Sequence, residues 1–142
     1  MRTSILLVFI TLFQMSCNCD STHEQAFDQA HADSTLKAAN DSFYGALNDN
    51  FTGNTSSLEE IWSHGNDVSD QGPFGARLDG WDAVDAEFKK EGAMKLGGKV
   101  VCKNLIVRAG KEMGYTACIE EGENMSAEGQ PVVVRFRATN IF

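Results

Sequence analysis

The carboxyl-terminal stretch Val132–Phe142, with the sequence VVVRFRATNIF, constrains the fold more than any other part of the chain. Side chains of a β-strand alternate between its two faces. One face of this stretch therefore carries Val132, Val134, Phe136, Ala138, Asn140 and Phe142, and the other carries Val133, Arg135, Arg137, Thr139 and Ile141. Asn140 is the one polar residue on an otherwise apolar face. Such a face must be covered by helices, and it then becomes the floor of the core and of any pocket.

Helical patterns fill the first half of the chain. Apolar residues recur at helical spacing between His31 and Asn50, a short second helix follows at Leu58–Trp62, and a third begins near Asp79. Ser56 or Ser57 is the expected N-cap of the second helix.

The third helix is expected to end at Gly92 and at the following Gly97-Gly98 pair. Its pattern places Glu87 and Glu91 on the outward side. Ahead of the first helix, a capping-box pattern at residues 21–24 opens a polar segment.

Three strands are expected in the second half, at Lys99–Arg108, Met113–Glu121 and Val132–Phe142. Helices followed by antiparallel strands are typical of an α+β domain, with the helices gathered on one face of a curved sheet.

The first seventeen residues predict an export signal. Arg2 supplies the positive start, Ile5–Phe13 the apolar run, and a small-residue site ends at Cys17. The run is too short for a permanent membrane span, which needs about 20 apolar residues. Its ending resembles a bacterial lipoprotein signal, in which Cys17 would carry lipid, but Gln14 stands where leucine is usual, so plain secretion is the alternative. We expect a periplasmic or extracellular protein with no membrane attachment beyond a lipid at Cys17.

Charge is divided unevenly along the chain. Residues 18–88 carry fourteen acidic and two basic side chains, whereas residues 89–142 carry six acidic and nine basic ones. Nucleic-acid binders gain most of their affinity from phosphate neutralisation, so a chain of net charge −8 without a basic stripe is not expected to bind nucleic acid. No structural-zinc spacing, phosphate loop or G-x-S-x-G elbow is present, so we expect neither a metal nor a cofactor.

Two cysteines, Cys102 and Cys118, fall on the first two expected strands. If these strands form a hairpin, Cys118 lies opposite Asn104 or Leu105 and only diagonal to Cys102. Diagonal positions are about 7 to 8 Å apart, too far for an unstrained disulfide. We therefore expect two buried free thiols.

Four groups of residues, taken in order, carry a family resemblance: Phe43-Tyr44-x-Ala46-Leu47, Ile61-Trp62, Gly72-Pro73-Phe74-Gly75 followed by Gly80, and Arg137-Ala138-Thr139-Asn140-Ile141-Phe142. Together they resemble the SnoaL-like and ketosteroid-isomerase-like branch of the nuclear transport factor 2-like superfamily. The resemblance makes residues 35–142 one domain, after a signal at 1–17 and a polar helical or flexible segment at 18–34. It implies a cone, in which a bent antiparallel sheet wraps over three helices around a pocket. Family members continue into one more strand, so a sheet lacking its usual last strand is expected here.

The resemblance also implies catalytic positions. Family isomerases carry a general-base aspartate between the second and third helices, and the segment ending at Asp70 is similar to that region. The family's second acid maps to Asn140, whose amide can donate a hydrogen bond to an enolate oxygen. The family tyrosine maps to Phe43, with Tyr44 one step round the helix, and losing such a donor costs on the order of 10²-fold in rate. From the residues alone, Asp70 can equally be a turn residue bonded to its own backbone, and Asn140 can satisfy a buried backbone group.

A ligand cavity in the cone would be lined mainly by aromatic side chains. The expected lining residues are Tyr44, Trp62, His64, Phe74, Trp81, Phe88 and Phe136. The alternative is that these aromatic residues form core. On the other face, Arg135 and Arg137 suit a salt bridge, a dimer contact or solvent, and His23 and His31 suit an exposed helix.

Three functions are compatible with this sequence. The first is an exported SnoaL-like domain that binds a small hydrophobic molecule in its cone and forms a homodimer through its sheet. The second is an isomerase or cyclase with Asp70 as general base and Asn140 as oxyanion donor. The third is a homo-oligomerisation module.

Overall fold

A computed structural model of the chain describes residues 26–142 except 73, 74, 76 and 127. The predicted signal at 1–17, the lipidation site Cys17, the capping box, His23 and Phe74 lie outside the described residues.

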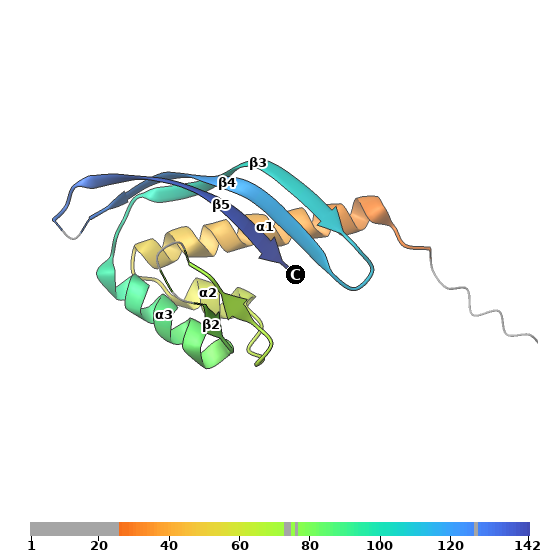
Figure 1. The fold of residues 1–142 in the computed structure, drawn as a ribbon, viewed down its shortest axis with the longest axis horizontal. Coiled ribbons are helices and arrows are strands. Elements are labelled where there is room, and N and C mark those ends of the chain that lie inside the picture. Colours follow the sequence, from red (N-terminus) through yellow and green to blue (C-terminus); the bar gives the residue numbers. More distant parts are fainter. Residues whose placement is uncertain (1–25, 73–74, 76, 127) are drawn as a thin grey trace, which may run out of the picture.

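The elements follow the predicted order, with helices first and long strands last. They are α1 (Gln29–Phe51), α2 (Ser56–Ile61), β1 (Ser69–Asp70), β2 (Leu78–Asp79), α3 (Trp81–Met94), β3 (Lys99–Ala109), β4 (Gly114–Met125) and β5 (Pro131–Ile141). The three long strands form an antiparallel sheet in the order β3-β4-β5, and β1 and β2 pair in a separate ladder. The sheet is bent, α1 runs along it, and α2 and α3 lie on that same side (Figure 1). The α+β prediction is confirmed.

Asp28 is the N-cap of helix α1, and its side chain accepts a hydrogen bond from the backbone N–H of His31. The helix runs without a break across residue 35, where the resemblance begins the domain. Its side chains also cover the outer edge of β3. The Asn48 amide exchanges two hydrogen bonds with the backbone of Val100, of 2.8 and 2.9 Å, and Asp33 accepts one from the N–H of Ala109. One edge of the sheet is thus closed by a helix.

The caps of the other two helices differ from prediction. Thr55 is the N-cap of α2, whereas the Ser56 and Ser57 hydroxyls donate to other side chains. Gly92 lies inside α3, which ends with Lys95 in the left-handed conformation (φ 49°).

Gly92 is buried because α3 packs closely against its neighbours. A Cβ at this position would stand 2.6 Å from Asn50 Oδ1 and 2.6 Å from Thr55 Cγ2. Glycine therefore serves helix packing here, and the prediction that it ends the helix is wrong.

The hairpin register agrees with prediction. Cys102 pairs with Glu120, and a bulge between Lys103 and Ile106 places residues 104–105 opposite Cys118. Both cysteines are free thiols; Cys118 is buried, whereas Cys102 is only half-buried.

The inner face of β5 is shorter than predicted. Val134, Phe136, Ala138 and Asn140 are half-buried along it. At its two ends, Val132 and Phe142 are each 44% exposed. Only the middle of the strand therefore forms the predicted apolar wall.

The core has two parts. One packs Ala46 on Leu58, Val84 and Phe88 among the three helices, and the other packs Tyr44 on Val100 and Cys118 between α1 and the sheet. None of the helices in the described part of the chain is long and apolar enough to cross a membrane.

Candidate functional site

The hydroxyl of Tyr44, on α1, lies on the concave side of the sheet. Its Oη donates a 3.0 Å hydrogen bond to Glu120 Oε1 on β4 and lies 3.2 Å from Cys118 Sγ. Phe43, about 100° round the helix, instead packs against Trp62 among the helices, with ring centroids 6.4 Å apart. Phe43, which the resemblance matches to the family tyrosine, thus packs against the core, and the next residue, Tyr44, directs a hydroxyl toward the sheet. Burial raises the pKa of Glu120, and the bond from Tyr44 opposes that rise.

Asp70 ends the short strand β1 and is half-buried. Burial raises the pKa of its carboxyl, and the negative charge of Glu87 raises it further. The backbone N–H groups of Gln71 and Gly72 donate to the carboxylate and lower its pKa. Asp70 is therefore both a residue bonded to its local backbone, as one alternative held, and a carboxylate held partly away from water.

Glu91 joins Asp70 from α3. Burial raises the pKa of Glu91 to about 6, with further contributions from Asp70 and Glu87, and Lys90 opposes the shift. Glu91 was expected on the outward side of α3, and the structure corrects this, because it is half-buried and within electrostatic reach of Asp70. Asp70 also raises the pKa of Glu120. Half-buried carboxylates from β1, α3 and β4 are therefore electrostatically coupled through Asp70.

Asn140 points inward and bonds to a buried side chain. Its Nδ2 donates a 3.1 Å hydrogen bond to Asn40 Oδ1, which also accepts one of 2.7 Å from Thr116 Oγ1. Asn40 itself is 0% exposed, and its Nδ2 donates to Cys102 Sγ at 3.8 Å. We call Asn40, Thr116 and Asn140 the amide cluster. One N–H of the Asn140 amide is thus bonded to the Asn40 side chain. The alternative, that Asn140 satisfies a buried backbone group, does not describe this bond.

The predicted aromatic lining residues that the structure describes lie in different surroundings. Phe88 is 6% exposed and packs edge-on against Trp62, with ring centroids 5.3 Å apart, so Phe88 belongs to the core and Trp62 lies at its margin. Tyr44 and Phe136 do lie on the concave side.

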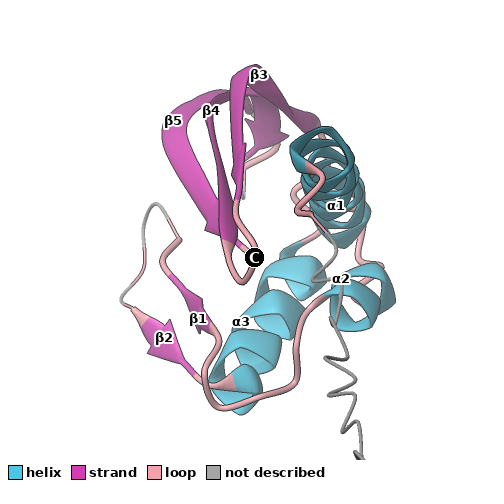
Figure 2. Ribbon diagram, turned by 90° about the vertical axis from the view of Figure 1, so that its right-hand side faces the viewer, coloured by secondary structure: helices cyan, strands magenta, loops and turns pink. Residues whose placement is uncertain are grey.

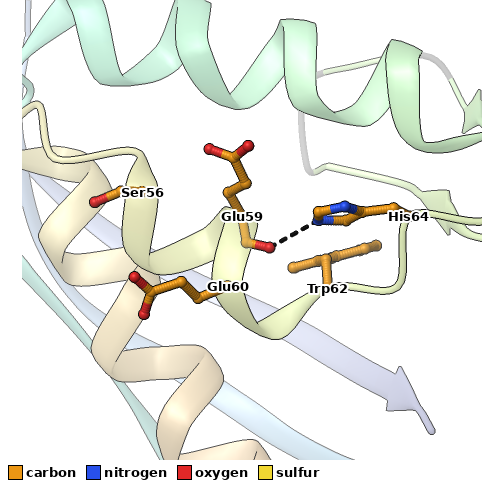
Figure 3. Close-up of a pocket in the computed structure, with 5 residues that line it drawn as sticks. All are labelled: Ser56, Glu59, Glu60, Trp62 and His64. Carbon is orange, nitrogen blue, oxygen red and sulfur yellow. Dashed lines mark hydrogen bonds between the residues drawn. The ribbon is translucent and has the colours of Figure 1, made fainter.

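The remaining pair, His64 and Trp81, stacks near the surface. Their ring centroids are 4.4 Å apart at an interplanar angle of 14°. His64 Nε2 is 2.9 Å from the carbonyl oxygen of Glu59 (Figure 3).

The surface of the described chain includes two hollows. One, of about 480 Å³, is lined by Ser56, Glu59, Glu60, Trp62 and His64 (Figure 3). The other, of about 310 Å³, is lined by Met113, Gly114, Tyr115, Thr139 and Ile141. Neither hollow includes Asp70 or Asn140, so the predicted pairing of these two residues in one pocket stays a prediction.

Sequence reasoning missed Asn40, Glu91, Thr116 and Glu120. The signal for Glu120 and Thr116 was available, because alternation along β4 places both on the face of Cys118. Asn40 stood on the apolar stripe of α1 without being singled out. For Glu91 there was no local signal, since its inward position depends on how α3 meets β1.

Three solved structures with this fold resemble the chain. A candidate dehydratase of the nuclear transport factor 2-like family from Streptomyces avermitilis has a TM-score of 0.69 and 20% identity, over 80% of this chain and 85% of that one. A candidate calcium/calmodulin-dependent protein kinase type II association domain from Thiobacillus denitrificans has a TM-score of 0.56 and 21% identity, over 74% and 79%. Another from Xanthomonas campestris has a TM-score of 0.59 and 16% identity, over 82% and 78%.

No family model matches the chain, and no curated protein matches it in sequence. The structural likeness nevertheless defines the fold. This chain has the nuclear transport factor 2-like fold, with three helices on a bent antiparallel sheet.

Proposed function

We propose that this chain is a SnoaL-like domain that binds a small, mainly apolar molecule on the concave side of its sheet. The observation that supports the proposal is the composition of that side. Val134, Phe136 and Ala138 form a half-buried apolar row on β5, and Glu120 and Asp70 are carboxylates whose pKa is raised by burial. Apolar walls with a few convergent polar groups of perturbed pKa are typical of small-molecule sites.

Binding of the neutral fluorophore Nile red tests this proposal. Phe136→Ala should weaken Nile red affinity at least fivefold, because it removes the largest apolar side chain of the row. Val133→Ala is the matched control, since Val133 lies on the opposite face of the same strand and is 79% exposed. Thermal unfolding of both variants checks that they fold. Equal affinities in the two variants, or loss of binding on Tyr115→Ala at the outer hollow, would contradict binding on the concave side.

The second candidate is proton transfer by Asp70. A carboxylate with a raised pKa can remove a proton next to a carbonyl group and return it at the γ-carbon, which converts a β,γ-unsaturated ketone into its conjugated isomer. The raised pKa of Asp70 favours this role. Asn140 has one N–H left for the enolate oxygen, because the other is engaged with Asn40.

Conversion of a small β,γ-unsaturated ketone, followed by absorbance of the conjugated product, tests the second candidate. Asp70→Asn should abolish turnover and leave Nile red binding unchanged. Turnover that survives this substitution excludes Asp70 as the base.

We also propose a homodimer formed through the convex face of the sheet. That face exposes Ile106, Tyr115 and Ile141, which are 48%, 43% and 70% exposed. The two association domains that this chain resembles lend support to an oligomeric role. Sedimentation equilibrium tests it: Tyr115→Glu should give monomers where the unchanged chain gives dimers, and Lys99→Glu, at the far edge of the same face, should not.

Export and lipid attachment at Cys17 are proposed from the sequence. Fractionation of a bacterial host with palmitate labelling tests both. Label that is lost in Cys17→Ser supports a lipoprotein, whereas unlabelled protein in the periplasm or medium supports plain secretion.

A further inference from the structure

Two cysteine thiols meet between α1 and the sheet. Helix α1 lies against the sheet near β3, the strand that carries Cys102 (Figure 2). Asn40 Nδ2 donates to Cys102 Sγ at 3.8 Å, and Tyr44 Oη lies 3.2 Å from Cys118 Sγ. Asn40 and Tyr44 are four residues apart on α1, so their side chains are neighbours on one face of the helix. The helix therefore holds the two sulfur atoms in adjacent places.

The thiols also contact one another. Cys102 packs against the core cluster that contains Cys118. Burial raises the pKa of the Cys118 thiol, and a hydrogen bond with the Cys102 thiol raises it further. The two thiols are thus neighbours within one packed cluster, although no disulfide joins them.

The strand register explains how the thiols come together. Cys102 pairs with Glu120, so Cys118 is its diagonal neighbour on the same face of the sheet. In a regular hairpin such diagonal positions are about 7 to 8 Å apart. The register is irregular here, because a bulge lies between Lys103 and Ile106. A bulge bends its strand and increases the local twist, so the regular spacing does not fix the distance between the two sulfur atoms.

The bulge also gives β3 a place to move. The described register of β3 and β4 passes over residues 104 and 105, and Asn104 has the left-handed conformation (φ 55°). A disulfide needs its sulfur atoms about 2 Å apart and its Cα atoms closer than about 7 Å. Closing a bond from Cys102 therefore requires a small backbone shift, and the adjacent bulge, with fewer ladder bonds to break, is where β3 can make it.

We propose that Cys102 and Cys118 are a redox-active pair, which a small-molecule disulfide converts into an internal disulfide bond. The half-buried Cys102 reacts first: its sulfur bonds to one sulfur of the oxidant, and the other sulfur leaves as a thiol. The Cys118 sulfur then displaces the second half of the oxidant from Cys102. In sum, the two cysteines lose two electrons and two protons, and the oxidant takes them up as two thiols.

Two properties of this pair follow from its surroundings. The second step is slow, because little of the buried Cys118 is thiolate. The bond is readily reopened, because a disulfide that displaces the backbone is strained, and strained disulfides are the more reducible ones. The export proposed above would place the pair in an oxidising compartment. The inference itself does not depend on export or on ligand binding at the concave side.

Mass spectrometry of the full chain after equilibration with oxidised glutathione tests the proposal. Every sample carries Cys17→Ser and Cys19→Ser, so that only the described pair can react. More than half of the chains should lose the mass of two hydrogen atoms and carry no glutathione, and an excess of reduced glutathione should restore the original mass. Cys118→Ser should instead retain one glutathione on Cys102.

A matched variant keeps two cysteines but separates them. Cys118→Ser combined with Ile119→Cys moves the second thiol to the opposite face of β4, so it should form no internal disulfide. Thermal unfolding checks that this variant is folded. Glutathione that persists on Cys102 while Cys118 is present, disulfides between chains, or equal closure in the matched variant overturns the proposal. An internal disulfide that excess reduced glutathione leaves intact overturns it as well, since the pair would then be a permanent bond.

Discussion

Asn40→Ala should destabilise the protein by about 3 kcal/mol. Asn40 Oδ1 accepts hydrogen bonds from Thr116 and Asn140, and each contributes roughly 1 kcal/mol net. The Thr116 hydroxyl, on a residue only 1% exposed, would lose its partner, which adds roughly 1 kcal/mol or more. Thr116→Val removes the donor while keeping the shape of the side chain, so it should lower the free energy of unfolding by only about 1 kcal/mol.

Urea unfolding followed by circular dichroism measures these differences. With a slope of about 1.5 kcal/mol per molar urea, Asn40→Ala should lower the midpoint by about 2 M. The double variant, Asn40→Ala with Thr116→Val, should be no less stable than Asn40→Ala alone, because the buried hydroxyl that lost its partner is then gone. A loss below 1 kcal/mol for Asn40→Ala, or additive losses in the double variant, would refute the reasoning that the amide cluster is a coupled, buried unit.

Three further predictions concern other parts of the chain. Burial and Asp70 raise the pKa of Glu91 from 4.5 to about 6, so between these pH values the folded chain keeps a proton that the unfolded chain has lost. The free energy of unfolding should therefore fall as pH rises from about 4.5 to 6. Glu91→Gln should make the urea midpoints at pH 5 and pH 7 differ less than they do in the unchanged chain. Burial raises the pKa of the Cys118 thiol to about 12. In the native protein Cys118 should therefore react with Ellman's reagent much more slowly than the half-buried Cys102. Comparable rates for the two thiols would contradict the burial of Cys118. Gly92→Ala should lower the melting temperature. The added methyl group would stand 2.6 Å from two neighbouring atoms, and this overpacking costs about 1 to 3 kcal/mol, whereas the gain in helix propensity is about 1 kcal/mol. An unchanged or higher melting temperature would show that the helices can move apart to accept the methyl group.

Local sequence patterns predicted the elements and their order. The β5 alternation placed Asn140 on the inner face, and the hairpin register placed Cys118 opposite residues 104–105, as the structure confirms. Both follow from the period of a strand, which depends on neighbouring residues only. Glycine predicted the helix end less well. A glycine can end a helix, or it can lie inside one and let neighbouring helices approach closely, as Gly92 does.

The candidate site was predicted only in part. Asp70, Tyr44 and Phe136 were named, and the structure places Tyr44 and Phe136 at the concave side, whereas Phe88 belongs to the core. An aromatic side chain at helical spacing looks the same in both settings, since the choice depends on the direction of the helix relative to its neighbours.

The sequence by itself determined the class of fold, the helix and strand order, and the side on which each strand residue stands, because these follow from short-range periodicity and turn chemistry. Only the tertiary structure decided that Glu91 and Glu120 lie within electrostatic reach of Asp70, that the Asn140 amide bonds to Asn40, and that α1 closes the β3 edge. These features depend on contacts between residues dozens of positions apart. Such contacts form only when the helices have a fixed angle and depth on the sheet, and packing of the whole core sets both.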